Sequence, residues 1–379
     1  MQIVLSNIYN LNRLKIIHIK TQVRRLKYFT VLIEKISLAG ISKEILEQEI
    51  IVWSKGKHES FANYISSSGE IVESKNRPSS QSFKNYFECA KQLGLISEVN
   101  DSIFHSKIGY VFFCLKEYIP VINSSNEYCL SPLEKIFYLY VLINQDSDVL
   151  FSIINMLFSN IEDSLENLLK AYQQSITDRL NQKMNIISSI EYLKLLNTIN
   201  RIKEWRSPIR YSEDIVPPRL NWFIDLGLID EEYYLTTKKF KLNENGILFY
   251  LLVRKNRSFF DIDDDDLNCS YIQIINKVYF KNLAVTFDSL PEKLKEKLFH
   301  EIIIIVIKNF SVLGIPKIPL DQSLLFIALY FILKKNIIIE MEEIKNWIGY
   351  ERKIGNIYLG IRMSARSYES YISIKYHEA

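Results

Sequence analysis

Residues 93–96 read Leu-Gly-Leu-Ile, and the same four letters return at residues 226–229. Each copy follows a segment with helical spacing of apolar residues, and each precedes a polar stretch that leads to a second glycine, Gly109 or Gly246. Glycine commonly ends a helix in the left-handed backbone conformation, and a Leu-Ile pair beside turn residues is typical of a strand. The duplication therefore predicts two units with the order helix, hairpin, helix.

The helix of the first copy is predicted over residues 82–93, with clearly separated faces. Its apolar stripe recurs at steps of three and four residues, and consists of Phe83, Phe87, Ala90 and Leu93. Its polar face consists of Lys84, Asn85, Glu88, Lys91 and Gln92. After the hairpin, Ser106 is the expected cap of a return helix. Because the polar face mixes cationic and amide side chains, it is a candidate reader of DNA bases.

The second copy is expected to be a condensed version of the first. Pro217-Pro218 is predicted to start its helix, and Thr237-Lys238-Lys239 to form the tip of its hairpin. The marker glycines are 15 residues apart in the first copy (94 to 109) and 19 in the second (227 to 246), a difference that a surface hairpin tolerates. The hairpin of the second copy is therefore expected to be longer and basic.

Segments 87–113 and 223–252 resemble winged helix-turn-helix domains. Their tandem arrangement is similar to the DNA-recognition portions of some restriction enzymes and other prokaryotic defence proteins. In such proteins a recognition helix enters the major groove and the hairpin, or wing, contacts the backbone. The resemblance implies DNA-contacting roles for Lys84, Asn85 and Lys91 in the first copy, and for Arg219, Asn221, Lys238, Lys239 and Lys241 in the second. The inserted stretch 54–80, which contains Arg77, departs from the family pattern; Arg77 is included as a further DNA-binding candidate.

The expected fold class is mainly α with short β-hairpins, as tandem winged-helix domains joined by a helical connector. We place a first winged-helix domain at 1–122, the connector at 123–206, the second domain at 207–268 and a C-terminal helical domain at 269–379. Two interpretations of the C-terminal end stay open. Residues 355–366 form a third recognition-type helix, or 357–361 and 371–376 form a hairpin. Basic candidates there are Arg352, Lys353, Arg362 and Arg366.

Composition limits the class of protein. The chain has 379 residues, 48% hydrophobic and 24% charged, with a net charge of +3, so it can bury ordinary cores without disulfides or metals. Its four cysteines are far apart, which predicts reduced thiols. The apolar runs at 302–307 and 324–333 are shorter than the roughly 20 residues of a membrane span, and no signal peptide is recognisable. We expect a cytoplasmic bacterial protein without a membrane segment, metal or cofactor.

Motifs of common enzymes are missing from the sequence: GxxxxGK[ST], GxGxxG, HExxH and GxSxG do not occur. A nuclease would need acidic residues near a lysine, and Asp321, Glu343 and Lys345 suggest such a set, although the spacing at 341–348 is that of a charged helix. The acidic run 261–266 lacks the glycine and glutamate of an EF-hand loop. The favoured function is therefore recognition of double-stranded DNA, with any catalysis in a partner protein. A docking scaffold and a divergent metal-dependent nuclease are the alternatives.

Overall fold

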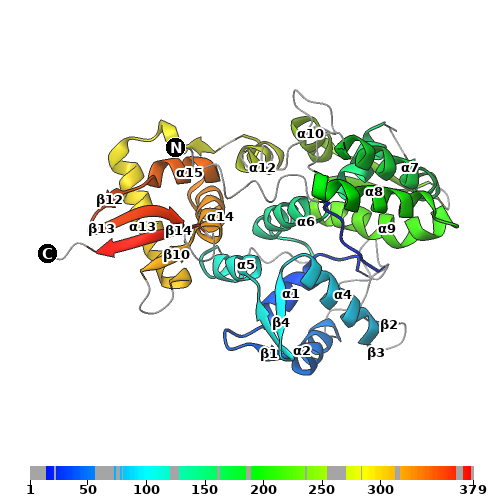
Figure 1. The fold of residues 1–379 in the computed structure, drawn as a ribbon, viewed down its shortest axis with the longest axis horizontal. Helices are drawn as coiled ribbons and strands as arrows, with labels where there is room; N and C mark the ends of the chain where they lie inside the picture. The colour runs from blue at the N-terminus through cyan, green and yellow to red at the C-terminus, as the bar shows by residue number, and fades with distance from the viewer. Residues whose placement is uncertain are drawn as a thin grey trace. The chain divides into compact units, whose positions relative to one another are not determined.

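The chain is mainly helical with several small antiparallel sheets, as its spacing predicts. The computed structural model describes residues 14–20, 23–55, 72–73, 77–78, 80–119, 128–159, 163–184, 189–234, 237–253, 270–282, 284–311, 316–363 and 370–376 (Figure 1). It divides into two compact units. Unit 1 comprises residues 1–11, 111–120 and 263–379, and unit 2 comprises residues 12–110 and 121–262. Both Leu-Gly-Leu-Ile copies lie in unit 2.

Copy 1, residues 41–109, is built on a three-stranded antiparallel sheet. Strand β1 (Ile41–Ser42) precedes helix α2 (Lys43–Lys55), and helix α4 (Ser80–Gln92) precedes the hairpin of β4 (Ile96–Val99) and β5 (Ser102–His105). The strand order is β1-β5-β4. Helix α1 (Lys27–Lys35) lies before the copy in sequence, and the two-residue strands β2 (Val72–Glu73) and β3 (Arg77–Pro78) pair between α2 and α4. The short strand β1 thus joins the hairpin from a distance of about 60 residues in sequence, Ile41 pairing with Ile103.

Copy 2, residues 163–246, repeats this order. Strand β6 (Asp163–Ser164) precedes α7 (Leu165–Met184), and α9 (Pro208–Leu226) precedes the hairpin of β7 (Ile229–Tyr234) and β8 (Thr237–Leu242). The strand order β6-β8-β7 matches that of copy 1. Helix α8 (Ser189–Lys203) is inserted between α7 and α9, and α10 (Glu244–Val253) follows the hairpin. A boundary at residue 206 would separate β6 from β8, the strand with which it pairs.

The helix-to-hairpin junctions of the two copies share their backbone geometry. Gly94 and Gly227 have φ of 67° and 72°, a conformation that glycine adopts without steric cost. The next amide in each copy reaches back into the preceding helix: Leu95 N–H donates to the Ala90 carbonyl and Leu228 N–H to the Phe223 carbonyl, both over 2.9 Å. This is a helix ending that satisfies the last free carbonyls. The repeated string therefore encodes one backbone turn twice.

The return helices begin with equivalent side-chain caps. In copy 1, Gly109 N–H donates to Ser106 Oγ over 3.0 Å, and the Ser106 hydroxyl donates to the Gly94 carbonyl. In copy 2, Gly246 N–H donates to Asn243 Oδ1 over 3.0 Å, and the Asn243 amide donates to the Gly227 carbonyl. The cap predicted at Ser106 is thus present, and its counterpart in copy 2 is an asparagine. Each cap ties its return helix to the end of the helix before the hairpin.

Two details of the copy 2 prediction are wrong. Pro217 and Pro218 lie inside α9, which begins at Pro208. Its first turn carries the proline, a position where the missing N–H costs nothing. Residues 237–239 belong to strand β8 and pair with 232–234 of β7, so they are not the tip of the hairpin; residues 235–236 lie outside the described residues. The three lysines after Thr237 therefore belong to a paired strand.

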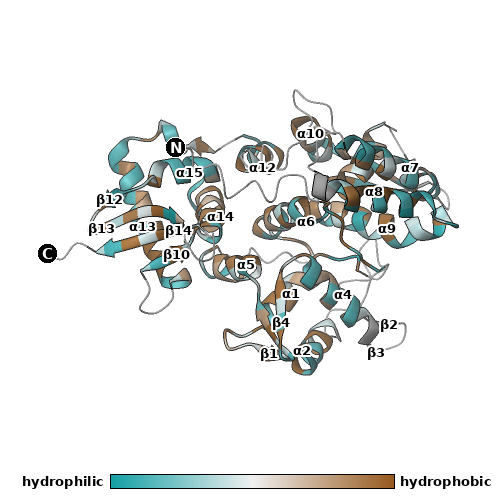
Figure 2. Cartoon of the chain, in the orientation of Figure 1, coloured by the Kyte–Doolittle hydropathy of each residue, from teal (hydrophilic) through white to brown (hydrophobic). Residues whose placement is uncertain are grey.

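Helix α6 (Pro132–Ser159) is the central helix of unit 2. By length and composition it is the one helix in the described ranges that could cross a membrane, but 78% of its most apolar window is buried inside the structure. Figure 2 shows apolar residues along α6, whereas α7 and α8 alternate apolar and polar colours. Asp146 interrupts the helical backbone of α6 with φ of −137° and ψ of 17°. At and just after this kink, the buried carboxylates of Asp146 and Asp148 accept hydrogen bonds from the N-terminal segment 14–20, which we call the strap.

The Asp146 carboxylate forms a buried, two-point ion pair with Arg219 of α9. Arg219 Nε lies 2.8 Å from one carboxylate oxygen and Nη2 lies 3.0 Å from the other, and both side chains are at most 1% exposed. The same two groups hold the strap, since Ile17 N–H donates to Asp146 and Arg219 Nη2 donates to the Ile17 carbonyl. Burial raises the pKa of Asp146, and the opposing charge of Arg219 offsets only part of that rise. The pair thus couples α6, α9 and the strap.

A second buried carboxylate, Asp148, fixes the strap two residues earlier. Lys15 N–H donates to Asp148 over 2.8 Å, and the Asp148 N–H donates back to the Lys15 carbonyl. Arg179 and Lys183 of α7 donate to the same carboxylate. Burial alone would raise the pKa of Asp148, but these two cations outweigh it and lower the pKa. Buried charges, rather than regular strand pairing, therefore hold the strap on unit 2.

Unit 1 is organised around a four-stranded antiparallel sheet. Its strands are β10 (Lys317–Pro319), β12 (Arg352–Ile354), β13 (Ile357–Met363) and β14 (Ser370–Tyr376), in the order β10-β14-β13-β12. The remaining elements are the end of α5 (Lys107–Tyr118), α12 (Tyr271–Tyr279), β9 (Val285–Thr286), η1 (Phe287–Ser289), α13 (Glu292–Phe310), α14 (Leu320–Tyr330), the π-helical turn η2 (Phe331–Lys335), β11 (Ile337–Ile338) and α15 (Met341–Ile348). The hairpin interpretation of the C-terminal end is therefore correct, and the helix interpretation of 355–366 is wrong.

Aromatic side chains fill the core of unit 1 between η1, α13, η2 and α15. The Phe299 and Trp347 rings stack at a centroid distance of 4.0 Å, and Phe287 and Phe331 meet them edge-on or tilted. Figure 2 shows that α14 is apolar over most of its length, which fits its buried position. The apolar side chains of α13 and α15 thus face a shared core, which agrees with the helical spacing expected at 341–348.

Candidate nucleic-acid interface

Helix α4 of copy 1 has the exposed polar face that its sequence predicts. Lys84, Glu88 and Gln92 are exposed and Asn85 is partly exposed, whereas Phe83 and Phe87 are fully buried. Lys84 has no ion pair with any residue that the structure describes. Gln92, at the end of α4, exchanges two hydrogen bonds with the backbone of His18 in the strap. The middle of α4 is therefore open to a ligand, and its C-terminal end is fixed to the strap.

Unlike Lys84, Lys91 already has an acidic partner, and the side chain of Arg77 is not among the described residues. The Lys91 ammonium lies 2.7 Å from Glu98 of β4 and 5.6 Å from the Phe87 ring centroid. The hydrogen bond to Glu98 raises the pKa of Lys91, so this lysine stays charged but is already paired. The backbone of Arg77 lies in β3, and its side chain lies outside the described residues. The structure thus leaves Lys84 and Asn85 as the accessible candidates on α4.

The helix of copy 2 that corresponds to α4 is buried on nearly all sides. Arg219 is 0% exposed and Asn221 is 7% exposed. Arg219 is taken up by Asp146, and the Asn221 amide donates to the Pro217 carbonyl one turn earlier. Asp225, further along α9, pairs with Arg25 at 2.7 Å, and both side chains are fully buried. Direct DNA contact by Arg219 and Asn221 is therefore wrong for this fold, because these side chains hold unit 2 together.

The basic hairpin of copy 2 faces acidic residues of its own sheet. Lys238 lies 2.6 Å from Glu231, and Lys241 is paired with Glu232, both on the neighbouring strand β7. Lys239 is half-buried and lies opposite Glu232 in the strand register. Cross-strand pairs of opposite charge stabilise a sheet. The positive charge of β8 is therefore largely neutralised within the hairpin itself.

The C-terminal candidates do not form one cationic surface. Arg352 lies 3.0 Å from Glu292 and 4.0 Å from the Trp347 ring centroid. Lys353 is exposed and lies 5.5 Å from the Tyr358 ring centroid. Arg362 donates to the Tyr350 carbonyl over 2.6 Å, and Arg366 lies outside the described residues. Each described arginine of this set is thus already engaged by its own unit.

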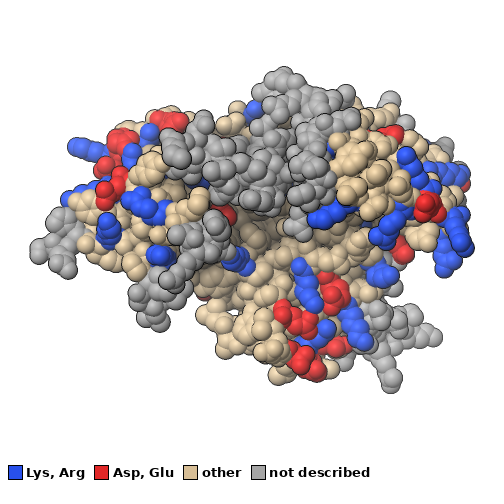
Figure 3. All heavy atoms as spheres, viewed as in Figure 1, with Lys and Arg blue, Asp and Glu red and all other residues tan. Residues whose placement is uncertain are grey.

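A cationic surface that the sequence prediction missed lies at the turn between α8 and α9. Lys203, Arg206 and Arg210 are exposed and make no ion pair within the described part of the chain. Figure 3 shows Lys and Arg side chains gathered over α7, α8 and the start of α9, whereas the surface around α2 and α4 mixes both charges. We call these three residues the α8–α9 corner. The sequence carries a signal for this surface, a local excess of Lys and Arg between 201 and 210, but the balanced charge of the whole helical connector conceals it.

His105, in strand β5 of copy 1, provides a pH-dependent test of this scaffold. Its Nε2 lies 2.9 Å from the Ile33 carbonyl, and burial lowers its pKa below the ordinary value of about 6.5. Because the folded chain disfavours the charged ring, unit 2 should lose stability as pH falls through 6.5 toward the folded pKa. Urea midpoints of the wild type should drop between pH 7.5 and 5.5, and His105→Gln should show a smaller drop.

Asp225 acts in the opposite direction over part of this range. Burial raises its pKa to about 6 despite the neighbouring Arg25, so its contribution favours folding as pH falls. The comparison between wild type and His105→Gln isolates the histidine, since both proteins carry Asp225. Equal midpoint shifts in the two proteins would contradict the assignment.

Two of the three residues suggested for nuclease chemistry, Glu343 and Lys345, are engaged in local structure, and the third, Asp321, is exposed in the first turn of α14. Glu343 accepts the Glu340 N–H over 2.6 Å as part of a capping box at the start of α15, and Lys345 pairs with Glu342. Within the described residues, no group of three or more His, Cys, Asp or Glu is placed to hold a metal ion. Comparisons of the chain with known protein families, with characterised proteins and with solved structures find no match.

Proposed function

We propose that copies 1 and 2 are winged-helix domains and that the protein binds double-stranded DNA. The observation that carries this proposal is the shared order of elements: a short strand, a helix, a second helix and a hairpin whose far strand pairs with the first. This is the order expected of a winged helix, in which the helix before the hairpin enters the major groove. Matched junctions and caps support a common origin for the two copies.

In this proposal copy 1 contacts the DNA bases, and copy 2 has a structural role. Copy 1 reads DNA through α4, where Lys84 and Asn85 are accessible. Lysine suits guanine and asparagine suits adenine in the major groove. Copy 2 serves as scaffold, since its corresponding helix is enclosed by α6, α7 and the strap. A buried Arg219 stabilises this core in the place where a DNA reader would need an exposed side chain.

In this proposal the α8–α9 corner supplies phosphate contacts. The strap connects the two surfaces, because His18 bonds to Gln92 of α4 and Ile19 shares a cavity wall with Tyr211 and Ile215 of α9. Unpaired, exposed cations favour a polyanion, since binding releases the counterions of its phosphates. Lys203, Arg206 and Arg210 therefore position the duplex while α4 reads it.

Replacing Lys203, Arg206 and Arg210 by alanine tests the phosphate surface. The slope of log Kobs against log salt should become less negative by up to about 2.7, since each lost phosphate contact removes about 0.9. Fluorescence anisotropy with a labelled 30-base-pair duplex at several salt concentrations measures it. The matched control is Lys170→Ala on α7, an exposed lysine already paired with Glu166. An unchanged slope in the triple variant would remove the corner from the interface.

The three lysines of strand β8 should contribute less to DNA binding than the α8–α9 corner does. Changing Lys238, Lys239 and Lys241 to alanine should reduce duplex affinity and salt dependence less than the corner variant, because Glu231 and Glu232 already neutralise two of these lysines. The same anisotropy titration measures the difference. A larger loss from the wing variant than from the corner variant would place the phosphates on the hairpin.

A protein-docking scaffold is the second candidate function. It is favoured by the burial of α9 and by exposed apolar side chains on α10, namely Ile247, Leu248 and Leu251. A winged helix whose recognition helix is buried can still dock another protein, because exposed apolar clusters bind protein surfaces. A chain that binds neither duplex nor single strands at low salt would favour this candidate over DNA recognition.

A further inference from the structure

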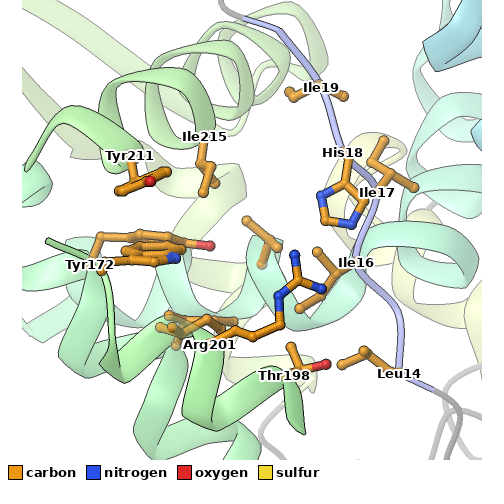
Figure 4. A pocket seen from close by; sticks show the side chains of 14 residues that line it. Leu14, Ile16, Ile17, His18, Ile19, Tyr172, Thr198, Arg201, Tyr211 and Ile215 are labelled. Carbon is orange, nitrogen blue, oxygen red and sulfur yellow. The ribbon is translucent and has the colours of Figure 1, made fainter. Parts of the chain in front are cut away.

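Unit 2 contains a cavity of about 290 Å³ between the strap, α7, α8 and α9 (Figure 4). Its wall is mainly apolar, formed by strap residues such as Leu14 and Ile16 and by Val149, Ile176 and Ile202 of the helices. An engineered apolar cavity of about 150 Å³ accommodates benzene, so this space has room for a larger organic body. Its size and lining are those of a small-molecule site.

Aromatic rings form one side of the cavity. Trp205 stacks between Tyr211, at a centroid distance of 5.2 Å, and Tyr172, at 6.4 Å. Gln173, next to Tyr172, donates to the Ile202 carbonyl over 2.6 Å and thereby joins α7 to α8. The stacked rings and this hydrogen bond join α7, α8 and α9 at this wall of the cavity.

Two polar groups turn toward the interior without a protein partner. The Tyr172 side chain is part of a residue only 2% exposed, yet its hydroxyl has no hydrogen bond to any residue that the structure describes. Figure 4 shows this hydroxyl and the Arg201 guanidinium pointing into the cavity from two different helices, α7 and α8. Arg201 likewise makes no ion pair or hydrogen bond within the described residues. Arg201 is an exposed residue, so water can hydrate its guanidinium, whereas the hydroxyl of the largely buried Tyr172 gains most from a partner in the cavity.

We infer that this cavity binds a small organic carboxylate with an apolar body. The carboxylate accepts hydrogen bonds from Arg201 and Tyr172, and the aryl or alkyl body fills the apolar space between the strap and α7. Guanidinium pairs well with a carboxylate because it offers two parallel N–H donors. The cavity borders the α8–α9 corner, but Lys203, Arg206 and Arg210 do not line it, so this inference does not depend on the DNA-binding proposal.

The strap links the cavity to the buried carboxylates in the core of unit 2. Its residues 15 and 17 are held by Asp148 and Asp146, while neighbouring residues of the same segment form the cavity wall. A ligand in the cavity touches both the strap and α7, and it binds only the folded unit. Bound ligand should therefore raise the melting temperature of the chain, since binding to the folded state alone stabilises it.

The test uses 4-phenylbutyrate and its neutral analogue 4-phenylbutyramide with the full chain. Calorimetric titration should show the carboxylate binding at least about tenfold more tightly than the amide, because a charge-assisted hydrogen bond contributes more than a neutral one. Arg201→Met and Tyr172→Phe should each weaken carboxylate binding, Arg201→Met by about tenfold, while amide binding changes little. Lys170→Met is the control, and it should bind both compounds like the wild type.

Circular dichroism melting of each variant establishes that it is folded before binding is measured. Equal binding of carboxylate and amide, or full carboxylate affinity in Arg201→Met, would overturn the assignment of Arg201. If neither compound binds the folded wild type at millimolar concentration, the inference of an organic carboxylate site is wrong. Ile16→Phe, which fills the cavity from the strap, should abolish binding of both compounds, and retained binding would place them elsewhere on the protein.

Discussion

Replacing Asp146 by alanine should lower the free energy of unfolding of unit 2 by about 3–5 kcal/mol. The change leaves the Arg219 guanidinium charged and buried, because both side chains are at most 1% exposed. It also removes the acceptor for the Ile17 N–H, so the strap loses a fixed point. Urea unfolding followed by far-ultraviolet circular dichroism measures the loss.

A double-mutant cycle separates the ion pair from general disruption of the core. Arg219→Met alone should also be strongly destabilising, since it leaves Asp146 buried without its partner. The double variant Asp146→Leu with Arg219→Met should lose less than the sum of the single variants Asp146→Leu and Arg219→Met, with a coupling of about 0.5–3 kcal/mol. Lys170→Ala, at an exposed ion pair, should change stability by no more than about 1 kcal/mol. Strict additivity across the cycle would show that the two side chains act independently.

Alanine at Gly109 or Gly246 should destabilise unit 2 by about 3 kcal/mol or more. A Cβ at either position would lie 1.9 Å from a backbone carbonyl oxygen, that of Leu95 or Leu228. Backbone cannot move aside as a flexible side chain can, so the return helix must shift. The identical distance in both copies makes the two substitutions matched measurements of one repeated contact.

Gly94→Ala is the control for the glycine pair. A Cβ at Gly94 meets no atom within 4 Å, and the substitution costs only the strain of φ at 67°. We expect a loss of about 1 kcal/mol, measured by the same urea unfolding. If Gly109→Ala and Gly94→Ala lose equal stability, close packing of the return helix on the hairpin is not what these copies share.

The duplicated junction could be predicted from the sequence because its signals are local. Glycine at the helix end and serine or asparagine at the next cap act within a few residues of themselves, so the string at 93–96 and 226–229 carried the information. The helix at 341–348 was predicted with its observed bounds for the same reason, since a short amphipathic stripe with acidic first-turn residues is a local pattern.

Local patterns could not predict which of the candidate DNA-binding side chains are buried in ion pairs. Arg219, a candidate reader, pairs with a carboxylate 73 positions earlier in the sequence. A single sequence does not reveal such partners, because periodicity shows which face is apolar but not which element covers the other face. The two-residue strand β6 also lacks a pattern of its own, and its pairing with β8 places the start of copy 2 inside the expected connector.

A fluorescence anisotropy titration of the wild-type chain against a labelled 30-base-pair duplex, with a single strand of equal length as competitor, tests the proposed function most directly. At low salt the chain should bind the duplex in preference to the single strand, and affinity should fall linearly on a log–log plot as salt increases. Changing Lys84 and Asn85 to alanine should narrow the difference in affinity among duplexes of different sequence. No duplex binding at low salt, or binding that does not respond to salt, would contradict the account.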